Sequence, residues 1–363
     1  MIDLKGIDWS IFLAAFTLVL LGLIMIYSSS AINAWRMVGQ TPYFFYRQLL
    51  WSFLGLLGCF TMAVLPQKLI KRASFPFYII VLFLLVAVLF PQIGFATRGS
   101  RRWIDLGFLR FQPSELAKLS VLLLGSLYLT NIERFDRQVF RNILALCLIA
   151  GIPAGMVIFQ PDLSSSIQIF SMGIILLILV GIAYRHLFAM FTVFAPVLGI
   201  VIFISGYRRA RILAYINPWG EPLESGYQAL HLFRSLASGG FWGRGLGSNV
   251  YRFLPEPFTD SIVAVVGEEL GFVGVLFIII VVFFILYRGI VVSLQNRDPY
   301  FQILGVGLSS LIGLQAAMNL SVVIGLLPTT GVTMPFISYG GTSLLLNLLV
   351  IGLLLNISRR RQL

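Results

Sequence analysis

Ten apolar segments alternate with shorter polar stretches along this chain of 363 residues. Several of them reach the roughly 20 residues that a helix needs to cross the hydrocarbon core of a bilayer. The stretch 164–206 is too long for one span, and Tyr184, Arg185 and His186 divide it, so we count it as two. The segments lie at about 9–30, 44–65, 75–93, 114–131, 141–159, 164–184, 186–206, 259–287, 300–327 and 342–357. The pattern predicts an all-α polytopic membrane protein with ten transmembrane helices in a single domain, residues 1–363.

The longest interval without a predicted span, residues 207–258, lies between the seventh and eighth predicted helices. Connections of this length are uncommon and are usually functional or disordered. Aromatic residues recur through it, so we expect it to be ordered, with a short interfacial helix at 230–236. Its glycine-rich part, 238–247, resembles a phosphate-binding loop only weakly, because no strand precedes it. Tight turns are the simpler role for these glycines.

The composition agrees with a membrane protein. Hydrophobic residues make up 58% of the chain and charged residues only 11%, whereas soluble domains average about 25% charged residues. Cys59 and Cys147 each fall in an apolar segment, so no disulfide framework is expected. His186 and His231 have no ligand spacing around them, so we predict no metal site. No cofactor is identified, although the sequence leaves a divalent cation open, and no nucleic-acid partner is expected.

Lysine and arginine residues predict the orientation. An even number of spans places both termini on one side of the membrane. The short loops that are rich in lysine and arginine lie on that same side. These cations are Lys68, Lys71, Arg72, Arg134, Arg137, Arg141, Arg185, Arg288, Arg297, Arg359, Arg360 and Arg361. The positive-inside rule makes that side cytoplasmic. We therefore expect a multi-pass protein of the bacterial cytoplasmic membrane, with both termini cytoplasmic and the 207–258 loop outside.

A second set of arginines opposes this bias, because it falls on the predicted outer side. Its members are Arg98, Arg101, Arg102, Arg110, Arg208, Arg209, Arg211, Arg234, Arg244 and Arg252. An anionic ligand at the outer membrane face is the simplest reason for them. The alternative is a solvated rim that contacts lipid head groups.

Carboxylates interrupt the apolar pattern at the eighth span. Asp260 stands where a proline-containing turn meets the helix, and Glu268 and Glu269 follow about two turns later. Ionisable groups within membrane segments are costly and suggest a functional site. The alternative for Asp260 is an ordinary N-cap, which Asp often provides, but capping leaves the two glutamates unexplained.

Three more charged residues lie at predicted helix starts. Glu115 and Lys118 are three residues apart, so they share a helix face and can pair. The pair either neutralises itself or forms the charged wall of a substrate cavity. Asp162 follows Gln160 and Pro161 and is expected to cap the next helix.

The last two spans are joined by an apolar connection at 325–343 that is dense in glycine and proline. Irregular backbone at membrane depth must be buried in protein or line a cavity. We expect one of these for this segment.

Five blocks in order resemble the SEDS family (shape, elongation, division and sporulation) and together span nearly the whole chain. They are RGSRRWIDLGFLRFQPSELAKL, QPDL, the segment 211–218 with Gly226, Tyr227 and Gln228, the stretch FLPE–TD–GEELG at 253–271, and GLLPTTGVTMPFISYGGTSLL. The closing block and the GRGLG turn are most similar to the division branch, with the sporulation branch close to it. Ser164 and Phe258 depart from the family pattern, which usually has Gly and His there.

The resemblance implies a peptidoglycan glycosyltransferase that polymerises lipid II at the outer membrane face, in septal synthesis during cell division. Asp260 would be the general base. The implied substrate-binding residues are Arg101, Arg102, Glu115, Lys118, Asp162, Arg211 and Glu268. The implied partners are lipid II, a class B penicillin-binding transpeptidase, and other membrane proteins of the division or elongation machinery. The alternatives are a lipid II flippase, a polymerase of the elongation branch, and a scaffold without chemistry.

Overall fold

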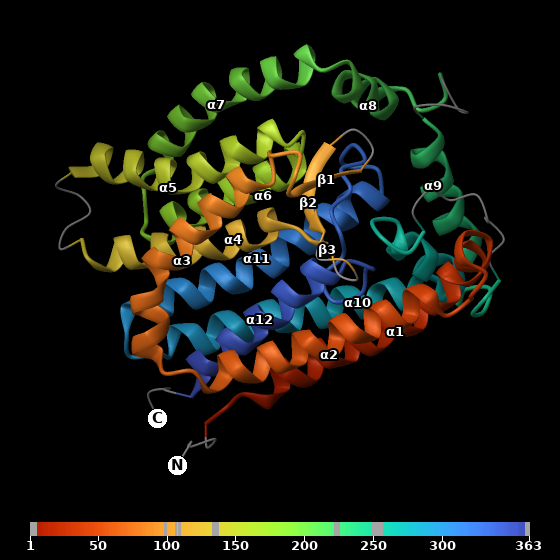
Figure 1. Cartoon of the computed structure of the whole chain (residues 1–363), viewed down its shortest axis with the longest axis horizontal. Coiled ribbons are helices and arrows are strands. Elements are labelled where there is room, and N and C mark those ends of the chain that lie inside the picture. Colours follow the sequence, from red (N-terminus) through yellow and green to blue (C-terminus); the bar gives the residue numbers. More distant parts are fainter. Residues whose placement is uncertain are drawn as a thin grey trace.

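The computed structural model describes residues 6–97, 100–105, 107, 110–132, 138–220, 226–248 and 257–359. These residues form helices and one small antiparallel sheet (Figure 1). The helices are α1 (Trp9–Val38), α2 (Tyr43–Val64), α3 (Gln67–Ala87), α4 (Pro113–Thr130), α5 (Val139–Phe159), α6 (Leu163–Leu179), α7 (Tyr184–Ile204), α8 (Gly206–Ile216), α9 (Tyr227–Gly239), α10 (Ile262–Leu294), α11 (Pro299–Val323) and α12 (Gly341–Ser358). The strands are β1 (Gly94–Thr97), β2 (Ser100–Asp105) and β3 (Arg110–Phe111).

Each of the ten predicted apolar segments corresponds to one helix, so the all-α polytopic class is confirmed. In the described part of the chain, 8 helices are long and apolar enough to cross a membrane. The other two predicted spans are α4 and α6. The first turns of α4 contain Glu115 and Lys118, and α6 is 17 residues long. Both pack among other helices, so neither depends on contact with lipid alone.

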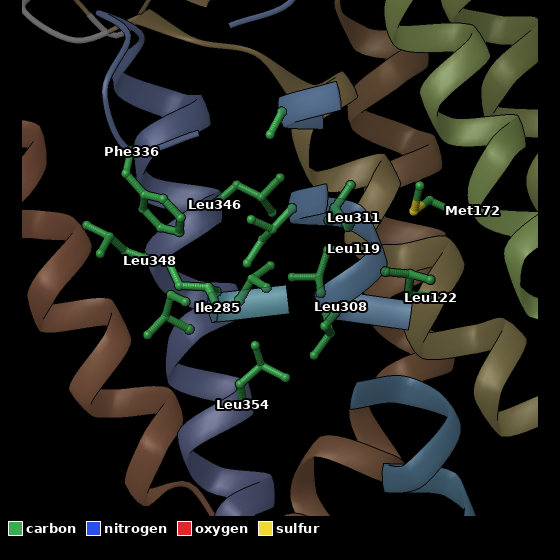
Figure 2. Close-up of a cluster of buried hydrophobic side chains, with 14 of the residues drawn as sticks. Leu119, Leu122, Met172, Ile285, Leu308, Leu311, Phe336, Leu346, Leu348 and Leu354 are labelled. Atoms are coloured by element: carbon green, nitrogen blue, oxygen red, sulfur yellow. The ribbon is translucent and has the colours of Figure 1, made fainter. Parts of the chain in front are cut away.

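The core lies where α4, α10, α11 and α12 meet. Figure 2 shows Leu119, Leu308 and Leu346 from three of these helices turned toward one another, with Ile285 from the fourth. Nearly every residue of α12 is buried, as expected for a helix that is apolar on all sides. Close packing extends to α2, because a Cβ atom on Gly352 would lie 2.3 Å from the carbonyl oxygen of Cys59. Small residues at such crossings let membrane helices approach closely.

Helix α7 lies at the margin of the molecule (Figure 1). None of its 21 residues, all of them described, is buried. It is held to the bundle by a ring contact between Phe194 and Phe170 of α6, with centroids 4.5 Å apart, and by Leu187 and Met190, which pack against the core. Other apolar side chains of α7, such as Phe188, Phe191 and Phe203, are exposed, as lipid-facing side chains are.

The two termini lie at the same end of the bundle (Figure 1). The backbone N–H of Asp8 donates to Ser358 Oγ at 3.0 Å, and Arg288 pairs with Asp8. Lys71 pairs with Asp298 at 3.4 Å, which joins two connections predicted for this same end. The contacts agree with the predicted alternation of helix direction.

The opposite end contains more secondary structure than the sequence pattern predicted. The interval 207–258 contains most of α8 and all of α9, and α9 includes the interfacial helix predicted at 230–236. The sheet was not predicted, because β2 reads Ser-Arg-Arg-Trp-Ile-Asp and lacks the alternation of apolar and polar residues typical of a strand. The Arg110 guanidinium of β3 lies over the ring of Phe95 of β1, 4.3 Å from its centroid, and so connects the two edge strands across β2.

Candidate active site

Asp260 lies at the mouth of α10 but does not cap this helix. The N-cap is Ser261, whose side chain makes no capping hydrogen bond. The Asp260 carboxylate instead accepts hydrogen bonds from Gln228 Nε2 of α9 at 3.3 Å and from Thr259 Oγ1 at 3.1 Å. The residue is half-buried. A partly exposed carboxylate can accept a proton from a substrate hydroxyl.

The backbone at Asp260 is held from α11. Asn319 Nδ2 donates to the carbonyl oxygen of Asp260 at 2.9 Å and to that of Val332 at 2.7 Å. One turn earlier on the same face, Gln315 Nε2 donates to the carbonyl oxygen of Thr333 at 3.1 Å. Sequence reasoning missed both amides, although two amides four residues apart in an apolar span were a readable signal.

The connection 325–340 accepts hydrogen bonds from several parts of the site. Ser164 Oγ at the start of α6 donates to the carbonyl oxygen of Thr330 at 2.7 Å, and Arg211 Nη1 of α8 donates to that of Thr329 at 2.9 Å. Much of the segment is buried in protein, which confirms one of the two expectations for it. Its buried residues are Val332, Met334, Pro335, Phe336, Ile337 and Ser338. Asp260, Arg211 and the start of α6 are thereby tied to one stretch of backbone.

Asp162 caps α6, as predicted. Its Oδ1 accepts from the backbone N–H of Ser165 at 3.1 Å. Its Oδ2 accepts from Gln112 Nε2 at 3.2 Å and lies 3.4 Å from Arg102 Nη1. Arg102 also donates through Nε to the carbonyl oxygen of Gln160 at 3.2 Å. Arg102 is therefore committed to the turn before α6, and its first role is to hold that turn.

Glu115 and Lys118 form the predicted ion pair inside the protein. Lys118 Nζ lies 2.8 Å from Glu115 Oε1 and 3.0 Å from Gln168 Oε1 of α6. The residues are 7% and 1% exposed, respectively. The second carboxylate oxygen of Glu115 is buried with no hydrogen-bond partner among the described residues. This leaves one strong acceptor free within a buried charged group.

Helices α4 and α6 run parallel and in register. Two hydrogen bonds with the same sequence offset join them, one from Gln112 to Asp162 and one from Lys118 to Gln168. Their N-termini therefore lie side by side at the end of the bundle that also holds Asp260. Helix N-termini carry positive partial charge and favour anions.

Arg101 is exposed on β2 and so is accessible to a ligand at this end. Other predicted positions lie outside the described residues. They are Arg98, Arg134, Arg137, Arg252, Arg360, Arg361 and the FLPE element at 253–256. Among the arginines predicted to face outward, the structure therefore distinguishes Arg102, which is engaged with the turn before α6, from Arg101, which is exposed.

Glu268 and Glu269 lie deeper in α10, and both are buried. Ser235 Oγ of α9 donates to Glu268 Oε2. Ser28 Oγ of α1 donates to Glu269 Oε1 at 2.7 Å, and the backbone N–H of Gly247 donates to the same oxygen at 3.2 Å. These contacts tie α10 to α1 and α9. The substrate-binding role of Glu268 stays a prediction.

The glycine-rich stretch 238–247 packs against a kink in α10. Gly271 has φ +69°, and a side chain there would bring its Cβ to 2.3 Å from a backbone nitrogen of this stretch. The backbone N–H of Arg244 donates to the carbonyl oxygen of Glu268 at 2.9 Å, and that of Gly245 to the carbonyl oxygen of Glu269 at 3.0 Å. Donors committed to the kink are not available to a phosphate, which favours the structural role expected for these glycines.

The surroundings shift the pKa of two side chains at this end, His231 and Tyr339. Burial, and then the charge of Arg234, lower the pKa of His231, so α9 carries a neutral imidazole one turn after the Asp260 donor. Burial raises the pKa of Tyr339, and the nearby charges of Arg47 and Arg110 oppose the rise. Arg47, which sequence reasoning did not single out, therefore adds positive charge beside the 325–340 connection.

Within the described ranges, no group of three or more His, Cys, Asp or Glu side chains is placed to hold a metal ion. The described residues supply a half-buried carboxylate, a buried ion pair, arginines and amides. Fold and site together define a polytopic helical membrane protein with a charged site where several of its helices end.

Comparison with known proteins gives the family. The sequence model of the FtsW/RodA/SpoVE family, described as cell cycle protein, matches residues 8–363. The chain is 33% identical over 358 residues to a probable peptidoglycan glycosyltransferase FtsW of Geobacter sp. strain M18, with 98% of each covered. It is 37% identical over 360 residues to stage V sporulation protein E of Bacillus subtilis strain 168, with 96% of each covered. The chain therefore belongs to the FtsW/RodA/SpoVE family, which confirms the SEDS resemblance of its motifs.

Solved structures share the fold. A chain of a peptidoglycan synthase complex, described as coordinating polymerization and crosslinking, matches with a TM-score of 0.83 and 28% identity over 98% of each chain. The rod shape determining protein RodA of Thermus thermophilus matches with a TM-score of 0.73 and 27% identity over 98% of each chain.

Proposed function

We propose that this protein is a peptidoglycan glycosyltransferase that polymerises lipid II at the outer face of the cytoplasmic membrane, in septal synthesis during cell division. The observation that carries the proposal is the placement of Asp260, half-exposed and held by Gln228 and Thr259 at the end of the bundle where α4 and α6 begin. Relatives named peptidoglycan glycosyltransferases cover nearly the whole chain, in agreement with the enzyme class expected from the sequence.

The reaction joins two lipid II molecules. The 4-hydroxyl oxygen of an acceptor GlcNAc attacks C1 of a donor MurNAc, and the bond from C1 to the polyprenyl diphosphate breaks with inversion. Asp260 takes the hydroxyl proton as the new bond forms. The diphosphate leaves with growing negative charge, which cations and helix N-termini stabilise. We assign this second role to Arg101, Lys118 and Arg211, with Glu115 and Asp162 orienting cations.

Purified protein mixed with lipid II tests the proposal directly. We expect glycan strands on a gel without any added polymerase. Transport of lipid II across vesicle membranes without strands would support the flippase instead. The second candidate finds less support, because the charged residues predicted for the substrate site gather at one end, apart from Glu268.

We predict that the Asp260 end of the bundle faces outward and that both termini are cytoplasmic. Gln40 and Gln295 are exposed at opposite ends. In a Cys147→Ser background, which leaves only the buried Cys59, an impermeant maleimide should label Gln40→Cys in intact cells. It should label Gln295→Cys only after the membrane is opened. The reverse pattern would overturn the orientation.

Substitution of Arg101 tests whether the outer arginines bind an anionic ligand or only form part of the general surface. Because Arg101 is exposed, Arg101→Ala should fold normally and bind lipid II about fivefold more weakly, the effect of losing one cation near a phosphate. Arg209→Ala, which removes another exposed arginine at the same end, is the control and should bind as the wild type does. If Arg101→Ala bound lipid II as well as Arg209→Ala does, the result would favour the alternative, in which the outer arginines form a solvated rim that contacts lipid head groups. Arg102 is unsuitable for this test, because it holds the turn before α6.

We also propose a single-span transpeptidase of the class B penicillin-binding type as partner, alongside other division proteins. The described residues contain no soluble catalytic domain that would cross-link peptides, and a similar chain occurs in a peptidoglycan synthase complex. The transpeptidase should co-purify with the wild-type protein from its own membranes in mild detergent. Clean separation that persists after chemical cross-linking would count against this partner.

A further inference from the structure

A polar cavity lies at the end of the bundle opposite to Asp260, where α2 turns into α3 and α10 turns into α11. Gln67 Nε2 and Asn296 Nδ2 place it beside the C-terminus of α12, since they donate to the carbonyl oxygens of Asn356 at 3.3 Å and Ile357 at 2.9 Å. Its volume is about 530 Å³, which lies within the usual size range of ligand pockets. Its lining residues are Gln67, Lys68, Lys71, Asn296, Arg297, Asp298 and Phe301.

The lining is positively charged. It contains three cations and one carboxylate, Asp298. That carboxylate is already engaged, because its Oδ1 accepts from the backbone N–H of Tyr300 at 2.9 Å and its Oδ2 pairs with Lys71 at 3.4 Å. Lys68 and Arg297 are exposed at the cavity. An anion that entered would meet two accessible cations and a third close by.

The cavity is held in shape by its own contacts. Asn296 is 1% exposed, and its Oδ1 accepts from the backbone N–H of Asp298 at 3.0 Å. Gln302 Nε2 donates to the carbonyl oxygen of Asn296 at 2.7 Å. The Lys71 ammonium lies 5.3 Å from the centroid of the Tyr300 ring. A preformed site loses less conformational entropy when it binds a ligand.

The surroundings favour a lipid over a soluble anion. Leu69 and Leu294, which neighbour the lining in sequence, are 49% and 62% exposed. Apolar side chains beside a basic cavity suit a molecule with a charged head and acyl chains. The orientation proposed above places the cavity in the cytoplasmic leaflet, where anionic lipids are concentrated and where basic pockets between helices bind their head groups.

We propose that this cavity binds the phosphate of an anionic phospholipid head group, through Lys68, Lys71 and Arg297. A free phosphate shares the same chemistry and must be distinguished by experiment. The proposal does not involve Asp260 or glycosyl transfer, so either can fail without the other.

Native mass spectrometry of the full-length protein in detergent tests the site, with phosphatidylglycerol or phosphatidylcholine added in turn. The variant is Lys68→Gln/Arg297→Gln, which removes the two exposed cations and keeps the Lys71–Asp298 pair. The matched control is Arg72→Gln/Arg185→Gln, two exposed arginines at the same end that do not line the cavity. The charge-preserving Lys68→Arg/Arg297→Lys variant checks that changes at these positions are tolerated.

We expect wild type to retain phosphatidylglycerol in preference to phosphatidylcholine. The Lys68→Gln/Arg297→Gln variant should bind phosphatidylglycerol about 10- to 30-fold more weakly, while the control and the charge-preserving variants bind as wild type does. If the control lost as much phosphatidylglycerol binding as the Lys68→Gln/Arg297→Gln variant, general surface charge would explain the binding. That result would overturn the proposal. Displacement of the lipid by millimolar inorganic phosphate would reassign the site to a soluble anion. A wild type with no preference for phosphatidylglycerol over phosphatidylcholine would also overturn the proposal.

Discussion

Asp260→Asn should lower the rate of glycan polymerisation at least about 100-fold, the low end of the effect of general acid–base catalysis. The substitution keeps the size of the side chain. Gln228 and Thr259 donate to different carboxylate oxygens, so the single amide oxygen of Asn can keep one of these two bonds. The bond from Asn319 goes to the backbone carbonyl and is unaffected. Lipid II binding should largely survive, because the lost interaction belongs to the transition state.

The control for this variant is Asp105→Asn, at an exposed carboxylate at the same end of the bundle. Asp105 accepts from the backbone N–H of Gly107 at 2.9 Å and pairs with Arg110, so it tests the loss of one negative charge away from Asp260. Gln228→Ala should give an intermediate rate, since it removes one hydrogen-bond donor and leaves the carboxylate in place. A folded, membrane-inserted Asp260→Asn protein that polymerises at near wild-type rate would remove Asp260 as the base.

Much of the fold was readable from the sequence because membrane spans follow one simple rule. Ten apolar segments predicted ten helices, since a backbone in lipid must satisfy its own hydrogen bonds. The small sheet at 94–111 lies outside the spans and has no such constraint, and its charged strands carried no period-2 signal. The division of 207–258 into α8 and α9 was only partly predicted, because both helices combine charged residues with short apolar faces.

The candidate site was predicted as a set of charges but not as an arrangement. Asp260, Asp162 and the pair of Glu115 with Lys118 were visible because charges are rare in apolar segments. Their connections depend on neutral amides, chiefly Gln112, Gln168 and Asn319, and on backbone carbonyls of the 325–340 connection. Backbone groups have no side-chain signature, so sequence reasoning could not identify them as partners.

The buried pair of Glu115 and Lys118 gives the second large effect. Lys118→Met should destabilise the protein by about 3–5 kcal/mol, because it leaves the Glu115 carboxylate buried without its partner. Adding Glu115→Gln should restore stability, since neutral groups of similar volume often replace a buried ion pair without loss. Gln168 can then bond with the new amide at position 115, because its Nε2 has no hydrogen-bond partner among the described residues.

The double variant separates the two roles left open for this pair. If the pair only neutralises itself, Glu115→Gln/Lys118→Met should recover both thermal stability in detergent and the rate of strand synthesis. We expect stability to return while lipid II binding and polymerisation stay low, because Lys118 would be needed as a cation for the diphosphate. Thermal unfolding, lipid II binding and the glycan gel measure the three quantities on one preparation. A stable double variant with wild-type polymerisation would show that the pair is structural, and the substrate-facing role would pass to Arg101 and Arg211.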